Sequence, residues 1–253
     1  MNQLGMDAIH HRRRPFAGGR YRAPSEIHSI AVPALLAELG RGALEDKQLD
    51  FLRPSGRVGD ARIYYAGDLS ELKRPAVSIV GTRDVSVEGW KRAYRLAREL
   101  AEAGVTVVSG LAKGVDTAAL QSALESGGRT AAVIGTPLDK AYPVENARMQ
   151  ERLWSEHLLM TPFRVGEQTF KGNFPKRNRV MAAVSDATVI VEASDTSGTL
   201  HQAAECGRLG RWLFIMRSVA EDSSLTWPAK FIDKPNVAVL ASTQDILDVV
   251  KPK

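Results

Sequence analysis

The chain has 253 residues, of which 44% are hydrophobic and 25% charged, and its net charge is +5. These are the proportions of an ordinary globular protein, and the length suffices for one large α/β domain with a modest appendage. The single cysteine, Cys206, excludes an internal disulfide and a cysteine-rich zinc site. No apolar run is long enough to span a membrane and no secretory signal opens the sequence, so we expect a cytoplasmic protein without metal or other cofactor.

The first 30 residues differ from the rest in composition. Five arginines fall between positions 12 and 22, among histidines and glycines, and no apolar periodicity accompanies them. Such a segment lacks the apolar residues needed to build a core, so we expect a basic, flexible arm over 1–30. Two interpretations stay open for it: a tail without function, and an accessory arm that binds nucleic acid.

Residues 31–70 are predicted to form a short helical segment followed by a lead-in strand. Leucines recur at helical spacing between Val32 and Phe51, with a break near Gly40–Gly42, which predicts two short helices. The sequence Arg62–Tyr65 predicts an edge strand before Gly67.

From residue 71 to 253, strand and helix patterns alternate. The expected strands are the apolar runs that begin at Ala76 and Val105, followed by Thr130–Ile134, Ala187–Glu192, Trp212–Met216 and Val237–Leu240. Helical patterns separate them, and Gly104 is placed to end the first helix. Regular alternation is typical of the α/β class, so the sequence predicts a doubly wound, mostly parallel sheet.

Three loops that follow predicted strands combine small residues with hydroxyls or cations. In an open parallel sheet, ligands bind outside the carboxyl ends of the strands, where backbone N–H groups at helix N-termini favour anions. We therefore expect these loops to bind phosphate. Their candidate residues are Gly81, Thr82 and Arg83; Ser109, Gly110 and Lys113; and Ser197, Gly198 and Thr199.

A fourth candidate is a basic cluster at the start of a short apolar helix. It consists of Lys176, Arg177, Asn178 and Arg179, and Phe174 precedes it. Arginine matches phosphate oxygens bidentately, and an aromatic ring beside a basic cluster can stack on an unpaired base. Two alternatives stay open, namely a solvated charged face and a Phe174 that simply packs in the core.

Little in the sequence points to catalysis. Ser197, His201 and Asp195 lie close together, but the Gly-x-Ser-x-Gly elbow of a serine hydrolase is absent around Ser197. Asp116 follows the second loop, where we interpret it as a helix cap rather than a catalytic acid. The sequence therefore favours a binding protein over an enzyme.

Several motifs occur in an order that resembles one family. They are Val-Gly-Thr-Arg at 80–83, Ser-Gly-Leu-Ala-Lys-Gly-Val-Asp at 109–116, Tyr-Pro at 142–143, Phe-Pro-Lys-Arg-Asn-Arg at 174–179 and Ser-Gly-Thr-Leu at 197–200. Together they resemble the DNA-processing protein A (DprA/Smf) family. The resemblance implies an extended Rossmann-like fold, binding of single-stranded DNA, and assistance to loading of the recombinase RecA in recombination or transformation. It also implies that Arg83, Ser109, Gly110, Lys113, Arg177 and Arg179 line the strand-binding pocket.

The resemblance further implies a homodimer built from the C-terminal part of the domain. Apolar residues suited to such an interface are Trp227, Phe231, Val237, Val239 and Leu240, although they would serve equally well to close the core.

The main alternative is a nucleotide-binding protein of the same fold. The basic helix followed by Ser-Gly-Thr also resembles the nucleoside-monophosphate phosphoribohydrolases, whose catalytic glutamate lies three residues after the threonine. Here Gln202 occupies that place, and an amide cannot act as a general base. Glu205, one turn further on, is a conceivable substitute. A small-nucleotide sensor without turnover is a further alternative, since phosphate-binding loops would serve it too.

Overall fold

The computed structural model describes residues 21–41 and 61–250. Their strands are β1 (His28–Ala31), β2 (Arg62–Gly67), β3 (Ala76–Val80), β4 (Thr106–Ser109), β5 (Thr130–Val133), β6 (Leu158–Thr161), β7 (Ala187–Ile190), β8 (Trp212–Met216) and β9 (Val237–Leu240). The α-helices are α1 (Val32–Glu38), α2 (Val87–Glu102), α3 (Val115–Glu125), α4 (Ala147–Glu156), α5 (Asn173–Val184), α6 (Thr199–Arg208), α7 (Arg217–Ala220) and α8 (Thr243–Leu247). Short 3₁₀ turns cover Leu69–Lys73, Val144–Asn146 and Pro228–Lys230.

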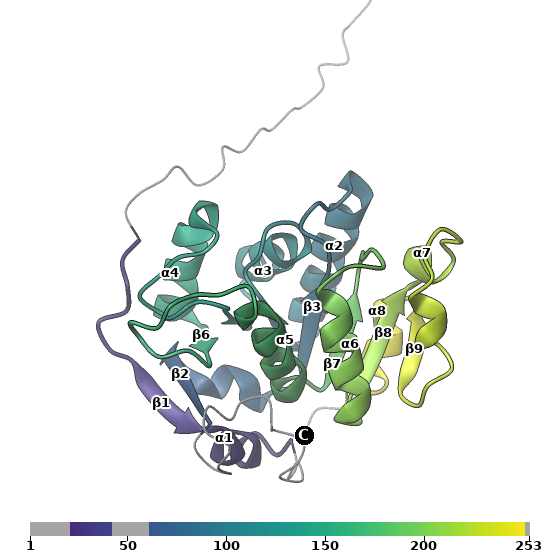
Figure 1. Cartoon of the computed structure of the whole chain (residues 1–253). Helices are drawn as coiled ribbons and strands as arrows, with labels where there is room; N and C mark the ends of the chain where they lie inside the picture. The colour runs from purple at the N-terminus through teal and green to yellow at the C-terminus, as the bar shows by residue number, and fades with distance from the viewer. Residues whose placement is uncertain (1–20, 42–60, 251–253) are drawn as a thin grey trace, which may run out of the picture.

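All the described strands belong to one sheet in the order β1-β2-β6-β5-β4-β3-β7-β8-β9 (Figure 1). Neighbours are parallel from β6 through to β9, whereas β2 is antiparallel to both β6 and β1. After β1 and β2, the chain enters the parallel part of the sheet at β3, runs outward through β4, β5 and β6, and then returns to the other side of β3 for β7, β8 and β9. This is the expected doubly wound α/β fold, and the predicted fold class is confirmed.

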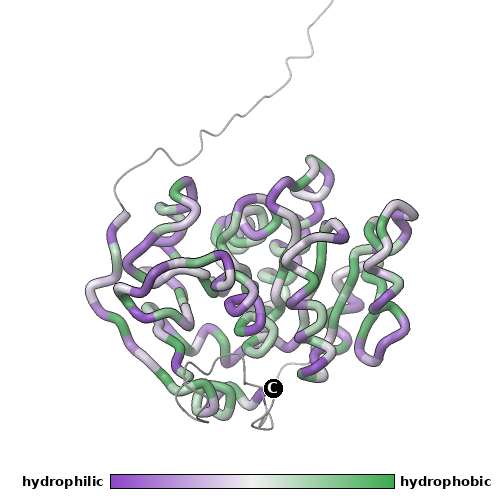
Figure 2. The backbone as a smooth tube through the Cα atoms, in the orientation of Figure 1, coloured by the Kyte–Doolittle hydropathy of each residue, from purple (hydrophilic) through white to green (hydrophobic). Residues whose placement is uncertain are grey.

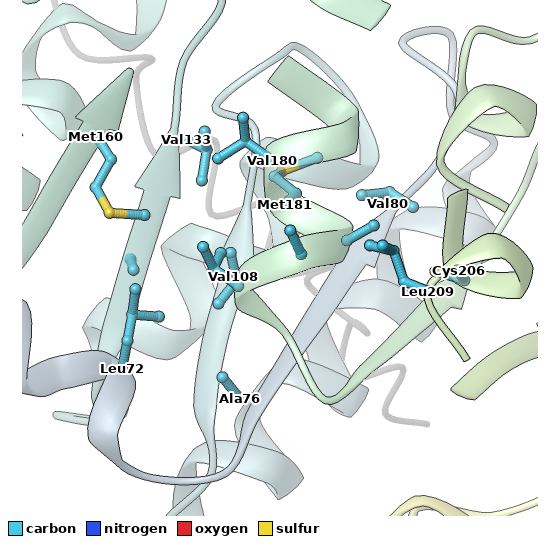
Figure 3. Close-up of a cluster of buried hydrophobic side chains, with 14 of the residues drawn as sticks. Leu72, Ala76, Val80, Val108, Val133, Met160, Val180, Met181, Cys206 and Leu209 are labelled. Carbon is cyan, nitrogen blue, oxygen red and sulfur yellow. The ribbon is translucent and has the colours of Figure 1, made fainter. Parts of the chain in front are cut away.

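Alternate residues of the central strands face opposite layers of helices, as the two-residue period of a strand requires. Val77 and Ile79 pack towards α2 and α3, whereas Val80 belongs to the core on the α5 side. Figure 3 shows this second core, where Val180 and Met181 of α5 lie against the sheet. Because both faces are covered, the central strands are mostly apolar, and the polar residues that they bury are serines and threonines. The green of β8 in Figure 2 illustrates this composition.

Local signals explain where helix α2 begins and ends. The Ser86 side chain accepts a hydrogen bond from the Gly89 N–H, which caps the N-terminus. At the other end Gly104 has a φ of +76°, the left-handed conformation that glycine adopts without steric cost. The predicted role of Gly104 is therefore confirmed.

The N-terminal region corrects the predicted boundaries. Residues 21–30, expected to belong to the flexible arm, are packed: Tyr21 Oη donates to the Leu138 carbonyl at 2.8 Å, and β1 is an outer strand of the sheet. Burial raises the pKa of Tyr21 to about 12. The strand predicted near Arg62 is consequently not at the edge, because β1 covers it. The rest of the expected arm, 1–20, lies outside the described residues.

Two further differences concern short elements. The strand β6 has no counterpart among the predicted strands, because its four residues directly follow the helical pattern of α4. Of the two short helices expected before residue 52, the first is α1, and the second falls outside the described residues. The end of α1 is fixed to the main domain by Arg41, whose guanidinium donates to Asp186 at 2.8 Å and to the Leu72 carbonyl at 2.6 Å.

Candidate functional site

The candidate site lies where the order of the sheet reverses. The strands β4 and β7 flank β3 on opposite sides, so the loops after β3 and β7 diverge towards different layers of helices. A doubly wound sheet opens a crevice at this switch point, outside the carboxyl ends of its strands. The loops beyond Val80 and Ile190 therefore form the two walls of such a crevice.

A cavity of about 270 Å³ occupies this position. It brings together three of the predicted segments, from the loop after β3, the start of α5 and the loop before α6. The predicted site residues that line it are Gly81, Thr82, Arg83, Phe174, Arg177, Asn178, Ser197, Gly198 and Thr199.

The loop after β3 is held rigidly in place. The Thr82 N–H donates to the Glu192 carbonyl at 2.7 Å, and the Thr82 carbonyl accepts from the Val115 N–H at 3.2 Å. A Cβ at Gly81 would lie 2.5 Å from the Val115 side chain and 2.7 Å from the Glu192 carbonyl, so the closeness of these segments requires glycine. These contacts fix the position of the neighbouring Arg83.

Arg83 and Phe174 meet at the mouth of the crevice. The exposed Arg83 guanidinium lies 5.2 Å from the centre of the half-buried Phe174 ring, within the range of a cation–π contact. The ring also packs against Gly135, where a Cβ would approach it to 2.7 Å, and lies 5.6 Å from the ring of Tyr142. Phe174 thus combines packing with an exposed portion that faces the cavity.

Arg177 and Asp116 form the floor of the crevice, and both side chains are almost fully buried. Arg177 Nη1 lies 3.5 Å from Asp116 Oδ2 and 3.3 Å from the Val133 carbonyl. Burial lowers the pKa of Arg177 and raises that of Asp116, while each opposes the other's shift through its charge. Arg177 Nε is buried without a hydrogen-bond partner among the described residues.

The second wall is the loop after β7, which leads into α6. Asp195 accepts hydrogen bonds from the N–H groups of Thr226 and Trp227, which ties the loop to the segment after α7. Ser197 Oγ accepts from the Thr199 N–H at 3.2 Å, and Asn178 Nδ2 donates to the Gly198 carbonyl at 3.2 Å. The N-terminus of α6 therefore faces the crevice, where its dipole favours an anion.

Five of the predicted site residues do not line the cavity. Ser109 is buried and donates to the Ile79 carbonyl at 2.7 Å, and Gly110 lies beneath the Arg177 guanidinium. Lys113 is exposed and hydrogen-bonds Glu145 at 2.7 Å, and this contact raises its pKa. Lys176 is exposed, whereas Arg179 lies 4.0 Å from Glu205.

Helix geometry explains why the three cations of the basic cluster do not all reach the crevice. Lys176, Arg177 and Arg179 all lie in α5, where successive residues are about 100° apart around the axis. Only Arg177 points into the crevice, while the other two point to solvent and towards α6. The sequence pattern placed three cations together, but the helix separates them.

Two acids of the crevice were missed or misinterpreted from the sequence. Asp84 lines the cavity beside Arg83, and nothing in its sequence context distinguishes it from a surface charge. Asp116 was interpreted as a helix cap, which is wrong, because the N-cap of α3 is Gly114. The Asp116 carboxylate instead accepts the Ala112 N–H at 3.3 Å and faces Arg177. In the sequence, the only indication that Asp116 belongs to the site was its position directly after a glycine-rich loop.

The residues considered for catalysis are held in structural roles. Gln202 is fully buried and donates to Thr188 Oγ1 at 3.1 Å, and Glu205 forms an ion pair with Arg208. Ser197 is hydrogen-bonded within its own loop, and His201 is exposed on α6. Among the described residues, no group of three or more His, Cys, Asp or Glu side chains could hold a metal ion.

The expected interface residues divide into two groups. Trp227 and Leu240 are buried within the domain, and Trp227 Nε1 donates to the Ala193 carbonyl at 3.0 Å. These two close the core, which corrects their assignment to a pairing surface. Phe231, Val237 and Val239 are partly exposed.

The fold and the crevice define a doubly wound α/β protein whose switch point carries cations, backbone donors and an accessible ring. The profile of the DNA recombination-mediator protein A family matches residues 59–251. The chain belongs to this family.

A relative is the DNA processing protein DprA of Streptococcus pneumoniae, 37% identical over 185 residues that cover 73% of this chain and 65% of the relative. Protein Smf of Synechocystis is 39% identical over 60% of this chain and 39% of its own length. The chain thus spans less than two thirds of the length of either relative.

Solved structures show the same relationship. The structure of DprA from Streptococcus pneumoniae superposes with a TM-score of 0.72 at 32% identity, over 88% of this chain and 74% of that one. DprA from Helicobacter pylori, a single-stranded-DNA-binding protein, superposes with a TM-score of 0.68 at 25% identity, over 88% and 94% of the two chains. None of the described helices is long and apolar enough to cross a membrane.

Proposed function

We propose that this protein binds single-stranded DNA in the crevice at the switch point. The observation that carries the proposal is the pairing of Arg83 with the half-exposed ring of Phe174, directly beside the N-terminus of α6. Cations and backbone N–H donors bind the phosphates of a single strand, and an unpaired base stacks on the face of an aromatic ring. The crevice offers all three within one small volume.

Single strands should be preferred over duplex DNA. The bases of a duplex are stacked on each other, so their faces are not available to Phe174. The relative from Helicobacter pylori, which shares this fold at 25% identity, binds single-stranded DNA, and this supports the proposal.

The protein acts as a DNA-binding accessory factor and not as an enzyme. In this role it protects single-stranded DNA and assists the loading of a RecA-type recombinase, as the family name of a recombination mediator suggests. It works as a homodimer. The partly exposed Val237 and Val239 lie on β9, the edge strand of the sheet, which offers unpaired backbone groups for association, and the partly exposed Phe231 precedes this strand. A sedimentation profile that stays monomeric at micromolar concentration and above would contradict the dimer.

Fluorescence anisotropy with labelled single-stranded and duplex oligonucleotides tests the main proposal. The wild-type affinity should fall with salt by about 0.7 log units per phosphate contact for each tenfold rise in salt. Arg83→Ala should weaken binding and make this slope shallower by about one contact. Lys91→Ala is the matched control, because Lys91 is an exposed cation on α2 that pairs with Glu88 away from the crevice. Equal binding of duplex DNA, or an Arg83→Ala variant with wild-type affinity and slope, would show that the proposal is wrong.

A further inference from the structure

Large apolar side chains that remain exposed are concentrated in two segments of the chain, one of which places Tyr142 beside Phe174 of the crevice. In the described part of the chain there are five, and four of them lie on two loops: Tyr142, Val144, Val165 and Phe170. We call these four the apolar rim. Phe170 is 61% exposed and Tyr142 is 48% exposed, although aromatic rings normally contribute to cores or interfaces. An exposed apolar group of this kind marks a surface that another molecule covers.

The apolar rim is continuous with the crevice. The Tyr142 ring lies 5.6 Å from the Phe174 ring, and Phe170 precedes α5 by three residues, with its carbonyl accepting the Asn173 N–H. Lys140 Nζ donates to the Glu167 carbonyl at 2.9 Å, so the two loops that carry the rim are joined. The Tyr142 ring therefore extends the aromatic surface outward from Phe174, and Phe170 belongs to the segment that leads directly into α5.

The charge of the loop that carries Val165 and Phe170 favours nucleic acid as the occupant of the rim. On the other loop the acids Asp139 and Glu145 are opposed by Lys140 and by Lys113, which hydrogen-bonds Glu145. Between residues 164 and 176 the sequence contains the cations Arg164, Lys171 and Lys176 but only one acid, Glu167. The Glu167 carboxylate accepts the Arg164 N–H at 2.9 Å and is therefore directed back onto its own loop. Rings interleaved with cations form a platform on which successive unpaired bases stack while the backbone is neutralised. A docking surface for another protein would not require this continuity with Phe174.

We propose that the apolar rim is a second subsite for single-stranded DNA, where Tyr142 and Phe170 stack on the bases that follow those in the crevice. The inference rests on the proposed function, because the strand must first be anchored at Arg83 and Phe174. The second subsite predicts that affinity continues to rise when the strand is longer than the segment bound in the crevice. This added affinity comes from stacking.

Anisotropy with oligothymidylates of increasing length tests the inference. Phe170→Ala should weaken binding of a 20-nucleotide strand by about 5- to 150-fold, the effect of losing one stacked base, while a strand of three nucleotides binds as it does to wild type. The salt slope should stay unchanged, because stacking releases no counterions. Phe170→Trp and Tyr142→Phe, which keep a ring, should retain the wild-type length dependence.

Val87→Ala is the matched control, since it shortens an exposed apolar side chain that lies outside the rim, at the start of α2, and removes no ring. If Phe170→Ala and Tyr142→Ala, both with native melting temperatures, keep the wild-type length dependence while Arg83→Ala weakens binding, the second subsite is wrong and the crevice proposal stands. If wild-type protein binds no single-stranded DNA of any length, both proposals fail.

Discussion

Arg177 of α5 and Asp116 of α3 form a buried ion pair across the floor of the crevice, with 3.5 Å between Nη1 and Oδ2. The two residues are 61 positions apart in the sequence, and the pair connects the helix layers on opposite faces of the sheet. Each charge is removed from water and is compensated chiefly by the other. The pair therefore couples the stability of the fold to the geometry of the proposed binding site.

Removing one member of this pair should destabilise the protein strongly. Asp116→Ala leaves a buried guanidinium without its counter-charge, and we expect the free energy of unfolding to fall by about 3–5 kcal/mol. Chemical denaturation monitored by circular dichroism measures this change. Asp84→Ala is the control, because Asp84 lines the same cavity but is exposed, and its replacement should change stability by less than about 0.5 kcal/mol. Equal effects of the two variants would show that the ion pair is not important for stability.

Gly110 should tolerate no side chain. A Cβ at this position would lie 1.0 Å from Arg177 Nη1 and 2.6 Å from Asp116 Oδ2, so Gly110→Ala must displace the guanidinium from its buried position. We expect a loss of about 1–3 kcal/mol in unfolding free energy, the usual effect of overpacking, together with weaker binding of single-stranded DNA.

The control for Gly110 is another glycine-to-alanine change, Gly207→Ala. Gly207 lies in α6, where an added Cβ meets open space, so this variant should be stabilised by up to about 1 kcal/mol. The denaturation midpoints of the two variants should thus move in opposite directions. A Gly110→Ala protein as stable as wild type would mean that Arg177 can leave the floor without penalty.

Cys206 should be inert in the native protein. Its side chain is fully buried and donates to Thr188 Oγ1, and burial raises the pKa of the thiol to about 12. Because the thiolate is the reactive form, only about one molecule in ten thousand is reactive at pH 8. Ellman's reagent should therefore react with one thiol per chain after denaturation in guanidinium, but not on the same timescale before it. Stoichiometric reaction of the native protein within minutes would contradict this burial.

The protein should release no free base from nucleoside monophosphates. Gln202 stands where the phosphoribohydrolases carry their catalytic glutamate, and its amide is engaged with Thr188. Glu205, the other candidate, is paired with Arg208. Chromatography after prolonged incubation with purine and pyrimidine nucleotides measures any release. Base release that Glu205→Gln abolishes would establish the enzyme alternative.

Much of the α/β domain follows from sequence patterns alone. Apolar runs such as Ala76–Val80 and Trp212–Met216 form strands at the predicted positions. A strand that is buried on both faces appears in the sequence as a nearly continuous apolar run, which is easy to recognise. Gly104 ends α2 because few other residues adopt a left-handed conformation without strain. The same patterns located the loops around Arg83 and Ser197, since small residues after a strand indicate the binding edge of a parallel sheet. β6 was missed because its four residues directly follow the helical pattern of α4, and β1 was missed because it lies at the end of a segment whose basic composition indicated an arm.

Only the tertiary structure decided which of the candidate residues act together. Lys176, Arg177 and Arg179 are indistinguishable as a sequence cluster, yet the rotation of α5 directs Arg177 alone into the crevice. Asp116 resembled a local cap, but its partner comes from a helix on the opposite face of the sheet. Periodicity and turn chemistry are local properties, so they determine elements and loops from neighbouring residues. Burial and pairing depend on how distant segments pack, and that information exists only in the folded chain.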